Sequence, residues 1–189
     1  MNRIEMTNKL KEKLPAKRFE HCIGVEYTAG TLAFIYGVDL EKAMVAGLLH
    51  DCAKYVPNDK KIQKCEKRNI YISEVEYQNP DLLHAKLSAV YAKEKYGVID
   101  DEILNAIASH TTGKPNMTTL EKIIYIADFI EPNRDLLPEM DVIRQEAYTD
   151  LDICLLHILR NCMNHLCKRG AIVDPLTMET YEFYNKNKE

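Results

Sequence analysis

Apolar residues recur at every third or fourth position along most of this chain, which is the spacing of one face of an α-helix. The clearest stripe covers residues 16–36, and Pro15 and Gly37 mark its ends. No segment alternates between apolar and polar residues as a half-buried strand does. The pattern therefore predicts an all-α fold, a bundle of roughly eight to ten helices. Beyond residues 16–36, it predicts helices over residues 40–54, 59–68, 82–96, 100–110, 118–130, 139–148 and 150–169, and a last helix after Pro175.

The size and charge of the chain narrow the class of protein. Its 189 residues suit one domain, and since no linker or repeat divides them, we expect a single helical domain over residues 1–189. The formal net charge of −4 gives no sign of a nucleic-acid-binding surface, although it is compatible with a nucleotide substrate. No apolar run approaches the roughly 18 residues of a membrane helix, and residues 1–14 lack signal-peptide character, so we expect a cytoplasmic protein. The apolar helix faces suit a core or a homodimer interface equally, which leaves the oligomeric state open.

The cysteines are interpreted as reduced thiols, mostly buried, because none forms a C-x-x-C pair. They are Cys22, Cys52, Cys65, Cys154, Cys162 and Cys167. A zinc site is the alternative for the cluster of Cys154, His157, Cys162, His165 and Cys167. That cluster lies along one predicted helix, and ligands along one helix cannot all converge on one ion.

Four histidines and two aspartates stand among apolar or small residues on predicted helices. Burying an ionised aspartate there costs roughly several kcal/mol unless a partner compensates it, and a divalent cation is such a partner. Neutral imidazole and carboxylate are ligands that suit iron, manganese, cobalt or zinc. The residues of this set are His21, His50, His84, His110, Asp51 and Asp128.

The adjacent pair His50 and Asp51 is the most specific part of the set. Neighbouring residues of a helix diverge by about 100°, so both reach one ion only if it lies over the end or side of the helix. The two oxygens of Asp51 could also bridge two ions. Taken singly, such histidines are more often core residues and such aspartates more often caps, but the whole set favours a metal site. His157 and His165 have no comparable companions and are interpreted as ordinary structural residues.

These residues occur within a series of segments in a distinctive order. The segments are R-F-E-H at residues 18–21, L-L-H-D-C-A-K at 48–54, the histidine at 84, S-H-T-T-G-K at 109–114 and Y-I-A-D-F-I-E-P-N-R at 125–134. The series resembles the HD superfamily of metal-dependent phosphohydrolases and, more narrowly, its bacterial YqeK branch. The resemblance covers residues 18–177, which we take as the core of the domain.

This resemblance implies an HD-type helical bundle that acts as a symmetrical bis(5'-nucleosyl)-tetraphosphatase. The implied reaction cuts diadenosine tetraphosphate into two ADP by metal-activated water, with iron as the metal. The principal metal would be held by His21, His50, Asp51 and Asp128, and Asp51 would also orient or deprotonate the attacking water. His84 and His110 would bind a second metal or the phosphates directly.

Positive side chains beside these motifs are candidates to neutralise a polyphosphate: Arg18, Lys54, Lys114 and Arg134. An ordinary surface charge explains Arg18, Lys54 and Arg134 equally well, and it explains Lys114 better. The branch commonly has arginine where Lys114 stands, and lysine lacks the bidentate geometry of arginine, which weakens a phosphate role for it.

Two loops are further candidates for substrate contacts. Thr111 and Thr112, with the backbone near Gly113, could donate hydrogen bonds to phosphate, or could simply form a helix-terminating turn. Ile172 and Val173, in the loop 170–175, could line an apolar slot for adenine, or could simply link two helices.

Three other functions are weighed against this one. Another HD phosphohydrolase would share the metal site and differ only in the nucleotide that it cleaves. A non-catalytic nucleotide-sensing protein would keep a vestigial site, but every expected ligand is present here. A helical bundle without metal would leave Asp51 and Asp128 without partners among apolar neighbours.

Overall fold

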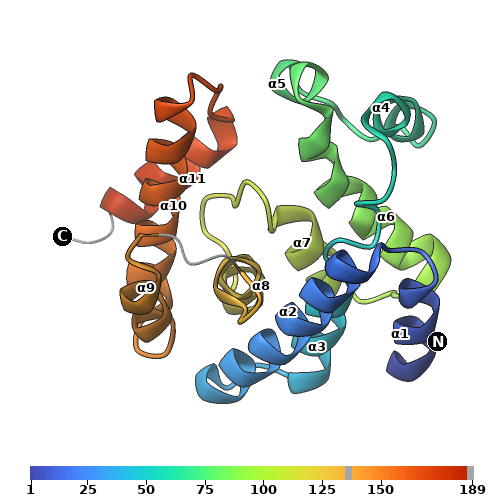
Figure 1. Cartoon of the computed structure of the whole chain (residues 1–189), viewed down its shortest axis with the longest axis horizontal. Helices are drawn as coiled ribbons and strands as arrows, with labels where there is room; N and C mark the ends of the chain where they lie inside the picture. The colour runs from blue at the N-terminus through green and yellow to red at the C-terminus, as the bar shows by residue number, and fades with distance from the viewer. Residues whose placement is uncertain (135–137, 187–189) are drawn as a thin grey trace.

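The computed structural model describes residues 1–134 and 138–186, and these contain eleven α-helices, one 3-10 helix and no strand (Figure 1). The helices are α1 (Arg3–Lys11), α2 (Ala16–Tyr36), α3 (Leu40–Leu49), α4 (Asn58–Glu66), α5 (Glu74–Gln78), η1 (Pro80–Leu83), α6 (His84–Tyr96), α7 (Asp101–Ser109), α8 (Thr119–Ile130), α9 (Met140–Ala147), α10 (Leu151–Lys168) and α11 (Pro175–Lys186). The predicted all-α class is confirmed. The predicted count of eight to ten helices was too low because α1 and α5 were not anticipated.

Helix α8 lies in the middle of the bundle (Figure 1). It packs against α2, α3 and α7 on one side and against α9 and α10 on the other. Three of its side chains, Ile123, Ile124 and Ile126, are completely buried. This packing brings the ends of α3 and α7 close to α2 and α8, where the chemically interesting residues lie.

Local chemistry sets most helix ends. The Asp39 side chain accepts a hydrogen bond from the Lys42 backbone at the start of α3, and Thr118 and Glu121 form the predicted capping box of α8. Gly37 ends α2 in the left-handed conformation, with φ of 67°, which glycine adopts without strain.

One predicted boundary was wrong in a way that matters for the site. The helix expected over residues 40–54 ends at Leu49, and the chain continues in tight turns in which the Lys54 backbone donates to the Asp51 carbonyl. His50 and Asp51 therefore lie at the end of a helix rather than along its side. This is the arrangement in which adjacent residues can face one ion.

Smaller differences concern two other helices. The helix expected from residue 82 begins as the 3-10 turn η1, and its α-helical part starts at His84. The helix expected over residues 59–68 spans Asn58–Glu66. Proline at the first position of η1 starts that turn, since its fixed φ suits a helical first residue.

The cysteines are free thiols, and most are buried, as expected. Cys22, Cys52, Cys65 and Cys154 are buried, Cys162 is half-buried and Cys167 is exposed. Among the helices of residues 1–134 and 138–186, none combines the length and apolar character required to cross a bilayer.

Candidate metal centre

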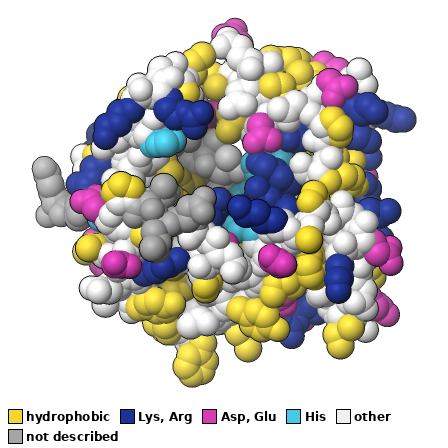
Figure 2. All heavy atoms as spheres, in the orientation of Figure 1, with side chains coloured by type: hydrophobic (Ala, Val, Ile, Leu, Met, Phe, Trp, Pro, Cys, Tyr) yellow, Lys and Arg dark blue, Asp and Glu magenta, His cyan; other side chains and the backbone are white. Residues whose placement is uncertain are grey.

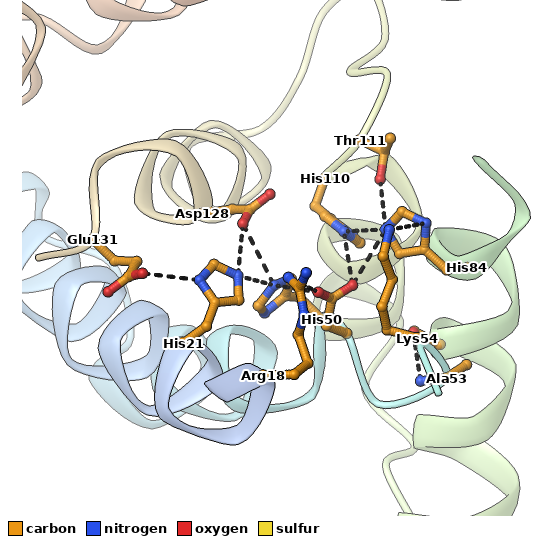
Figure 3. A network of polar contacts seen from close by, with 12 residues as sticks. Arg18, His21, His50, Ala53, Lys54, His84, His110, Thr111, Asp128 and Glu131 are labelled. Atoms are coloured by element: carbon orange, nitrogen blue, oxygen red, sulfur yellow. Dashed lines mark hydrogen bonds and ion pairs between the residues drawn. The ribbon is translucent and has the colours of Figure 1, made fainter. Parts of the chain in front are cut away.

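Six side chains from five parts of the fold converge at α8 (Figure 3). All four histidines and Asp51 are buried, and Asp128 is partly buried. Their positions are His21 within α2, His50 and Asp51 at the end of α3, His84 at the junction of η1 and α6, His110 at the end of α7, and Asp128 within α8. The structure thus brings together all six residues that the sequence singled out as metal ligands.

Each of the four histidines is held through Nδ1, which leaves Nε2 directed into the cluster. The acceptors are the backbone carbonyls of Gly47 for His50, Asp81 for His84 and Ile107 for His110, and the Glu131 carboxylate for His21. A carbonyl oxygen only accepts, so Nδ1 carries the proton in the three rings bound to carbonyls. When those rings are neutral, Nε2 therefore carries no proton and has a lone pair, with which it can bind a metal.

One half of the cluster contains His21, His50 and Asp128. The two Nε2 atoms of His21 and His50 lie 3.2 Å apart. Asp128 Oδ1 lies 3.0 Å from His21 Nε2 and 3.7 Å from His50 Nε2. Three ligand atoms therefore surround one small space.

The other half contains His84, His110 and one oxygen of Asp51. The Nε2 atoms of the two histidines lie 3.1 Å apart, and Asp51 Oδ1 lies 3.2 Å from His84 Nε2 and 3.8 Å from His110 Nε2. Asp51 Oδ2 faces the first half, 3.6 Å from His50 Nε2. The carboxylate of Asp51 consequently joins the two halves, in the position of a ligand that can bridge two ions.

The Asp51 carboxylate provides a direct test of whether a cation fits here. Its Oδ1 atom is buried and has no hydrogen-bond partner among the described residues. Burying a carboxylate oxygen without a hydrogen bond costs folding free energy. A divalent cation would compensate that cost, and the imidazole nitrogens around this oxygen are suitable further ligands for it. The donor set of imidazole nitrogens and carboxylate oxygens fits iron, manganese, cobalt or zinc.

The electrostatics favour ionised aspartates and two neutral histidines, the forms of these side chains that can bind a metal. Burial lowers the pKa of His84 and of His110 to about 4, so both rings are neutral at physiological pH. Burial opposes ionisation of Asp51, but the neighbouring histidines outweigh it and lower the pKa of the carboxyl. For Asp128, burial is likewise outweighed, chiefly by its hydrogen bond with His21, and its pKa falls well below the usual value.

A pocket of ≈ 440 Å³ opens onto the cluster. Figure 2 shows histidine side chains near the middle of this face, partly covered by lysine and arginine side chains. Arg18 Nη1 lies 2.8 Å from Asp51 Oδ2, and Arg134 Nη2 lies 2.6 Å from Asp128 Oδ1. Lys54 also lines the pocket, so three of the four predicted cations border the cluster.

The remaining predicted contacts divide into two groups. Thr111 lines the pocket, with Oγ1 3.2 Å from His84 Nε2. Lys114 instead pairs with buried Glu121 at 2.7 Å and is not among the described residues that line the pocket. Ile172 lies in the loop between α10 and α11, 60% exposed, and does not line the pocket either. Its part in nucleotide binding stays a prediction.

The sequence analysis missed a charged network beneath Lys54. Asp81 accepts hydrogen bonds from Lys54 Nζ at 2.8 Å and from Lys61 Nζ at 2.7 Å, and Lys61 is only 1% exposed. Burial opposes ionisation of Asp81, but the two ammonium groups outweigh it and lower the pKa of the carboxyl. Glu131, the acceptor for His21, was also missed, although it follows directly on the apolar run of α8.

Known proteins similar to this chain include the members of a domain family and full-length relatives. The HD domain family model matches residues 18–133. A Bacillus subtilis protein named "Bis(5'-nucleosyl)-tetraphosphatase, symmetrical" is 41% identical over 185 residues, which cover 97% of each chain. A Staphylococcus aureus protein of the same name is 38% identical, over 98% of this chain and 96% of its own.

A solved structure has the same fold over its whole length. It is a Clostridium acetobutylicum protein described as a predicted HD superfamily hydrolase involved in NAD metabolism. The TM-score is 0.95 at 39% sequence identity, and the match covers 99% of this chain and 98% of that protein. From the family match, the full-length relatives and the clustered histidines and aspartates, the chain belongs to the HD domain family.

Proposed function

We propose that this protein hydrolyses diadenosine tetraphosphate symmetrically, to two ADP, at a divalent metal centre formed by the six clustered residues. The observation that carries the proposal is the buried Oδ1 atom of Asp51, which lies among inward-facing histidine nitrogens and has no hydrogen-bond partner in the described part of the chain. The full-length relatives named as symmetrical bis(5'-nucleosyl)-tetraphosphatases, at 41% and 38% identity, support the reaction and substrate.

The principal metal would be held by His21, His50, Asp51 and Asp128, and His84 and His110 would hold a second ion or contact a phosphate. Iron is the metal that we favour, and the same donor set also accepts manganese, cobalt or zinc. When bound, such an ion would supply Lewis acidity, to polarise a phosphoryl oxygen and lower the pKa of water.

The protein's own contribution begins with Asp51. Its Oδ2 atom accepts a hydrogen bond from Arg18, and its Oδ1 atom, without a hydrogen-bond partner among the described residues, faces the space in which metal and water would bind. Because the pKa of this carboxyl is lowered, it orients a water molecule more effectively than it removes a proton from one. Water adds to one of the two central phosphorus atoms, and the bond from that phosphorus to the bridging oxygen breaks. One ADP leaves with the bridging oxygen, the other ADP carries the oxygen of the water, and the proton of the water is released to solvent.

Three cations would balance the charge of the phosphate chain. Arg18 and Arg134 each form an ion pair with an aspartate of the cluster. Lys54 lies beside His84. Each of these side chains has further N–H groups that can donate hydrogen bonds to phosphate oxygens. The guanidinium groups of the two arginines can each donate two parallel bonds to one phosphate. Thr111 offers a hydroxyl on the same wall.

The nucleoside parts need apolar surfaces with polar groups at the edge. Apolar and aromatic residues of the pocket meet this need: Leu82, Tyr125, Phe129 and Met140. Ile172 is exposed and is not among the residues that line this pocket. It would therefore contact only a part of a nucleoside that extends beyond the pocket.

Product analysis tests the proposal. Metal-free protein is loaded with ferrous iron under anaerobic conditions and incubated with diadenosine tetraphosphate, and the products are separated by anion exchange. Asp51→Asn serves as the inactive control. ADP as sole product, absent with the control, would support the proposal.

Other outcomes select the alternatives. ATP with AMP would keep the hydrolase and overturn the position of cleavage. No turnover by iron-loaded protein would point to another nucleotide as substrate, or to a non-catalytic nucleotide-sensing protein. A panel of mononucleotides and nucleotide polyphosphates separates these two, because a sensor binds nucleotide without turning any of it over.

A further inference from the structure

Among the four clustered histidines, His21 is held in a different way from the others. His50, His84 and His110 each lie at the end of a helix, where Nδ1 reaches a backbone carbonyl three residues earlier. Carbonyls in a last turn lack the usual partner four residues later and can accept from a side chain. The Asp81 carbonyl also accepts the His84 backbone N–H, and its second lone pair serves the ring. His21 lies within α2, where the preceding carbonyls are engaged in the helix, so its Nδ1 needs an acceptor from elsewhere.

Glu131 provides that acceptor from the end of α8. Its Oε1 atom lies 3.0 Å from His21 Nδ1, a contact drawn in Figure 3. The Glu131 side chain is only 1% exposed. The opposite ring atom, Nε2, faces Asp128 Oδ1 at 3.0 Å. The contact with Glu131 and the metal-binding face therefore occupy opposite ends of one imidazole ring.

The backbone turns Glu131 toward His21 for a local reason. Pro132 follows it, and the residue before a proline is disfavoured in the helical conformation. Glu131 accordingly has ψ of 150° and leaves α8 at this point. Its second oxygen, Oε2, accepts a hydrogen bond of 2.7 Å from the Asn133 backbone, which fixes the carboxylate at both oxygens.

Gly24 makes the space for this carboxylate. It lies on α2, three residues after His21, and a Cβ atom at this position would come within 2.2 Å of Glu131 Oε2. A side chain of any size here would push the carboxylate away from its place. The glycine and the glutamate thus form a matched pair across α2 and the end of α8.

We propose that Glu131 is a positioning residue for the metal centre: it holds the His21 ring through Nδ1 and raises the basicity of the Nε2 atom that faces the metal. Carboxylate–histidine pairs behind metal ligands act in this way, and losing the carboxylate typically weakens metal affinity by about 10–100-fold. The inference rests on the proposed function only in taking His21 as a metal ligand.

Metal binding is the first readout. Metal-free wild type, Glu131→Ala, Glu131→Gln and Gly24→Ala are titrated with zinc against a competing chelator. We expect each variant to bind about 10–100-fold more weakly than wild type. Gly24→Ala is the most informative variant because it removes no polar group and only displaces the carboxylate. Gly30→Ala on the same helix is its control, since a Cβ there meets only the flexible side chains of Met44 and Leu40.

A spectroscopic readout separates positioning from general support of the fold. In zinc-loaded protein with ¹⁵N-labelled histidine, the His21 Nδ1 proton should give a protected NMR signal. We expect this signal to be lost in Glu131→Ala and in Gly24→Ala and kept in Gly30→Ala.

The inference is overturned if Glu131→Ala and Gly24→Ala bind zinc within about twofold of wild type, or if the Nδ1 signal persists in both. If Glu131→Ala does not fold, Glu131→Gln and Gly24→Ala decide the matter. Neither readout uses turnover. A wild type that binds metal but leaves diadenosine tetraphosphate intact would therefore overturn the substrate while leaving this inference standing.

Discussion

The Nε2 atoms of His21 and His50 lie 3.2 Å apart, and the Nδ1 atom of each ring is already engaged on its outer side. His50 Nδ1 must donate to the Gly47 carbonyl, so its Nε2 presents a lone pair when the ring is neutral. Two nitrogen atoms this close, with Asp128 Oδ1 at 3.0 Å from one of them, form a site that a cation would stabilise.

Metal binding should therefore raise the melting temperature. A ligand at one hundred times its Kd stabilises the folded state by about 2.7 kcal/mol. In a chain of this size that corresponds to a rise of about 5–10 °C. Differential scanning fluorimetry with added manganese or zinc, against a chelator, measures it. Identical melting curves with and without metal would contradict the site, and the rise should be abolished in His50→Ala.

Replacing Asp51 by asparagine should remove turnover while leaving the fold intact. Asparagine keeps the shape but is neutral and has one oxygen in place of two, so it cannot offer a carboxylate oxygen to each half of the cluster. We therefore expect kcat/KM to fall by more than about 100-fold. Losing the ion pair with Arg18 destabilises the fold, but removing a buried charge whose Oδ1 has no partner among the described residues offsets that loss. The free energy of unfolding of the metal-free variant should therefore lie within about 1 kcal/mol of wild type. Asp59→Asn, on the exposed side of α4, is the matched control and should leave both quantities unchanged. A fully active Asp51→Asn variant would contradict the assignment.

The buried ammonium of Lys61 should contribute to stability through Asp81. Lys61→Met removes one of the two cations that hold the Asp81 carboxylate, and we expect a loss of about 1–3 kcal/mol in the free energy of unfolding. KM should rise as well, because Asp81 also positions Lys54 and, through its carbonyl, His84. Urea unfolding and steady-state kinetics measure the two effects. Lys67→Met, exposed on the surface, should change unfolding by less than about 0.5 kcal/mol; equal effects of the two variants would refute the role of Lys61.

The metal-free protein should lose stability as the pH falls from about 6.5 towards 4. Histidine in the unfolded chain has a pKa of about 6.5, whereas burial lowers the pKa of His84 and His110 to about 4. Between these values the unfolded chain takes up protons that the folded chain does not, so stability is present above pH 6.5 and declines below it. Each ring contributes a slope of at most about 1.4 kcal/mol per pH unit. Urea unfolding at several pH values, in the presence of chelator, measures the slope; His110→Gln should reduce it, and a flat profile would contradict the shifts.

Much of the site could be predicted because its parts are set by local chemistry. Apolar neighbours in the sequence predicted that His50 and Asp128 are buried, and His50 is fully buried and Asp128 partly. Buried histidines and aspartates need partners, which favoured a metal site. Caps such as Thr118 and stops such as Gly37 fixed helix ends in the same local way. The resemblance then linked residues far apart in the sequence into one set.

What could not be predicted depends on packing between distant segments. Lys61 lies on a polar helix, and nothing in its neighbours distinguishes it from an exposed lysine, yet Asp81 and Asn58 enclose it. Glu131 gains its meaning only from His21, 110 residues away in sequence. The end of α3 at Leu49 was missed because the apolar pattern continues through Cys52 and Ala53, which are buried in turns rather than in a helix.

The central claim is that the clustered histidines and aspartates hold the catalytic metal. Crystals of anaerobically iron-loaded protein, measured at wavelengths on both sides of the iron absorption edge, test it most directly. We predict an anomalous difference peak between His21, His50, Asp51 and Asp128, about 2.0–2.2 Å from the nearest ligand atoms. Crystals of turnover-competent protein with no peak in this cluster, or with the iron bound elsewhere, would contradict the claim.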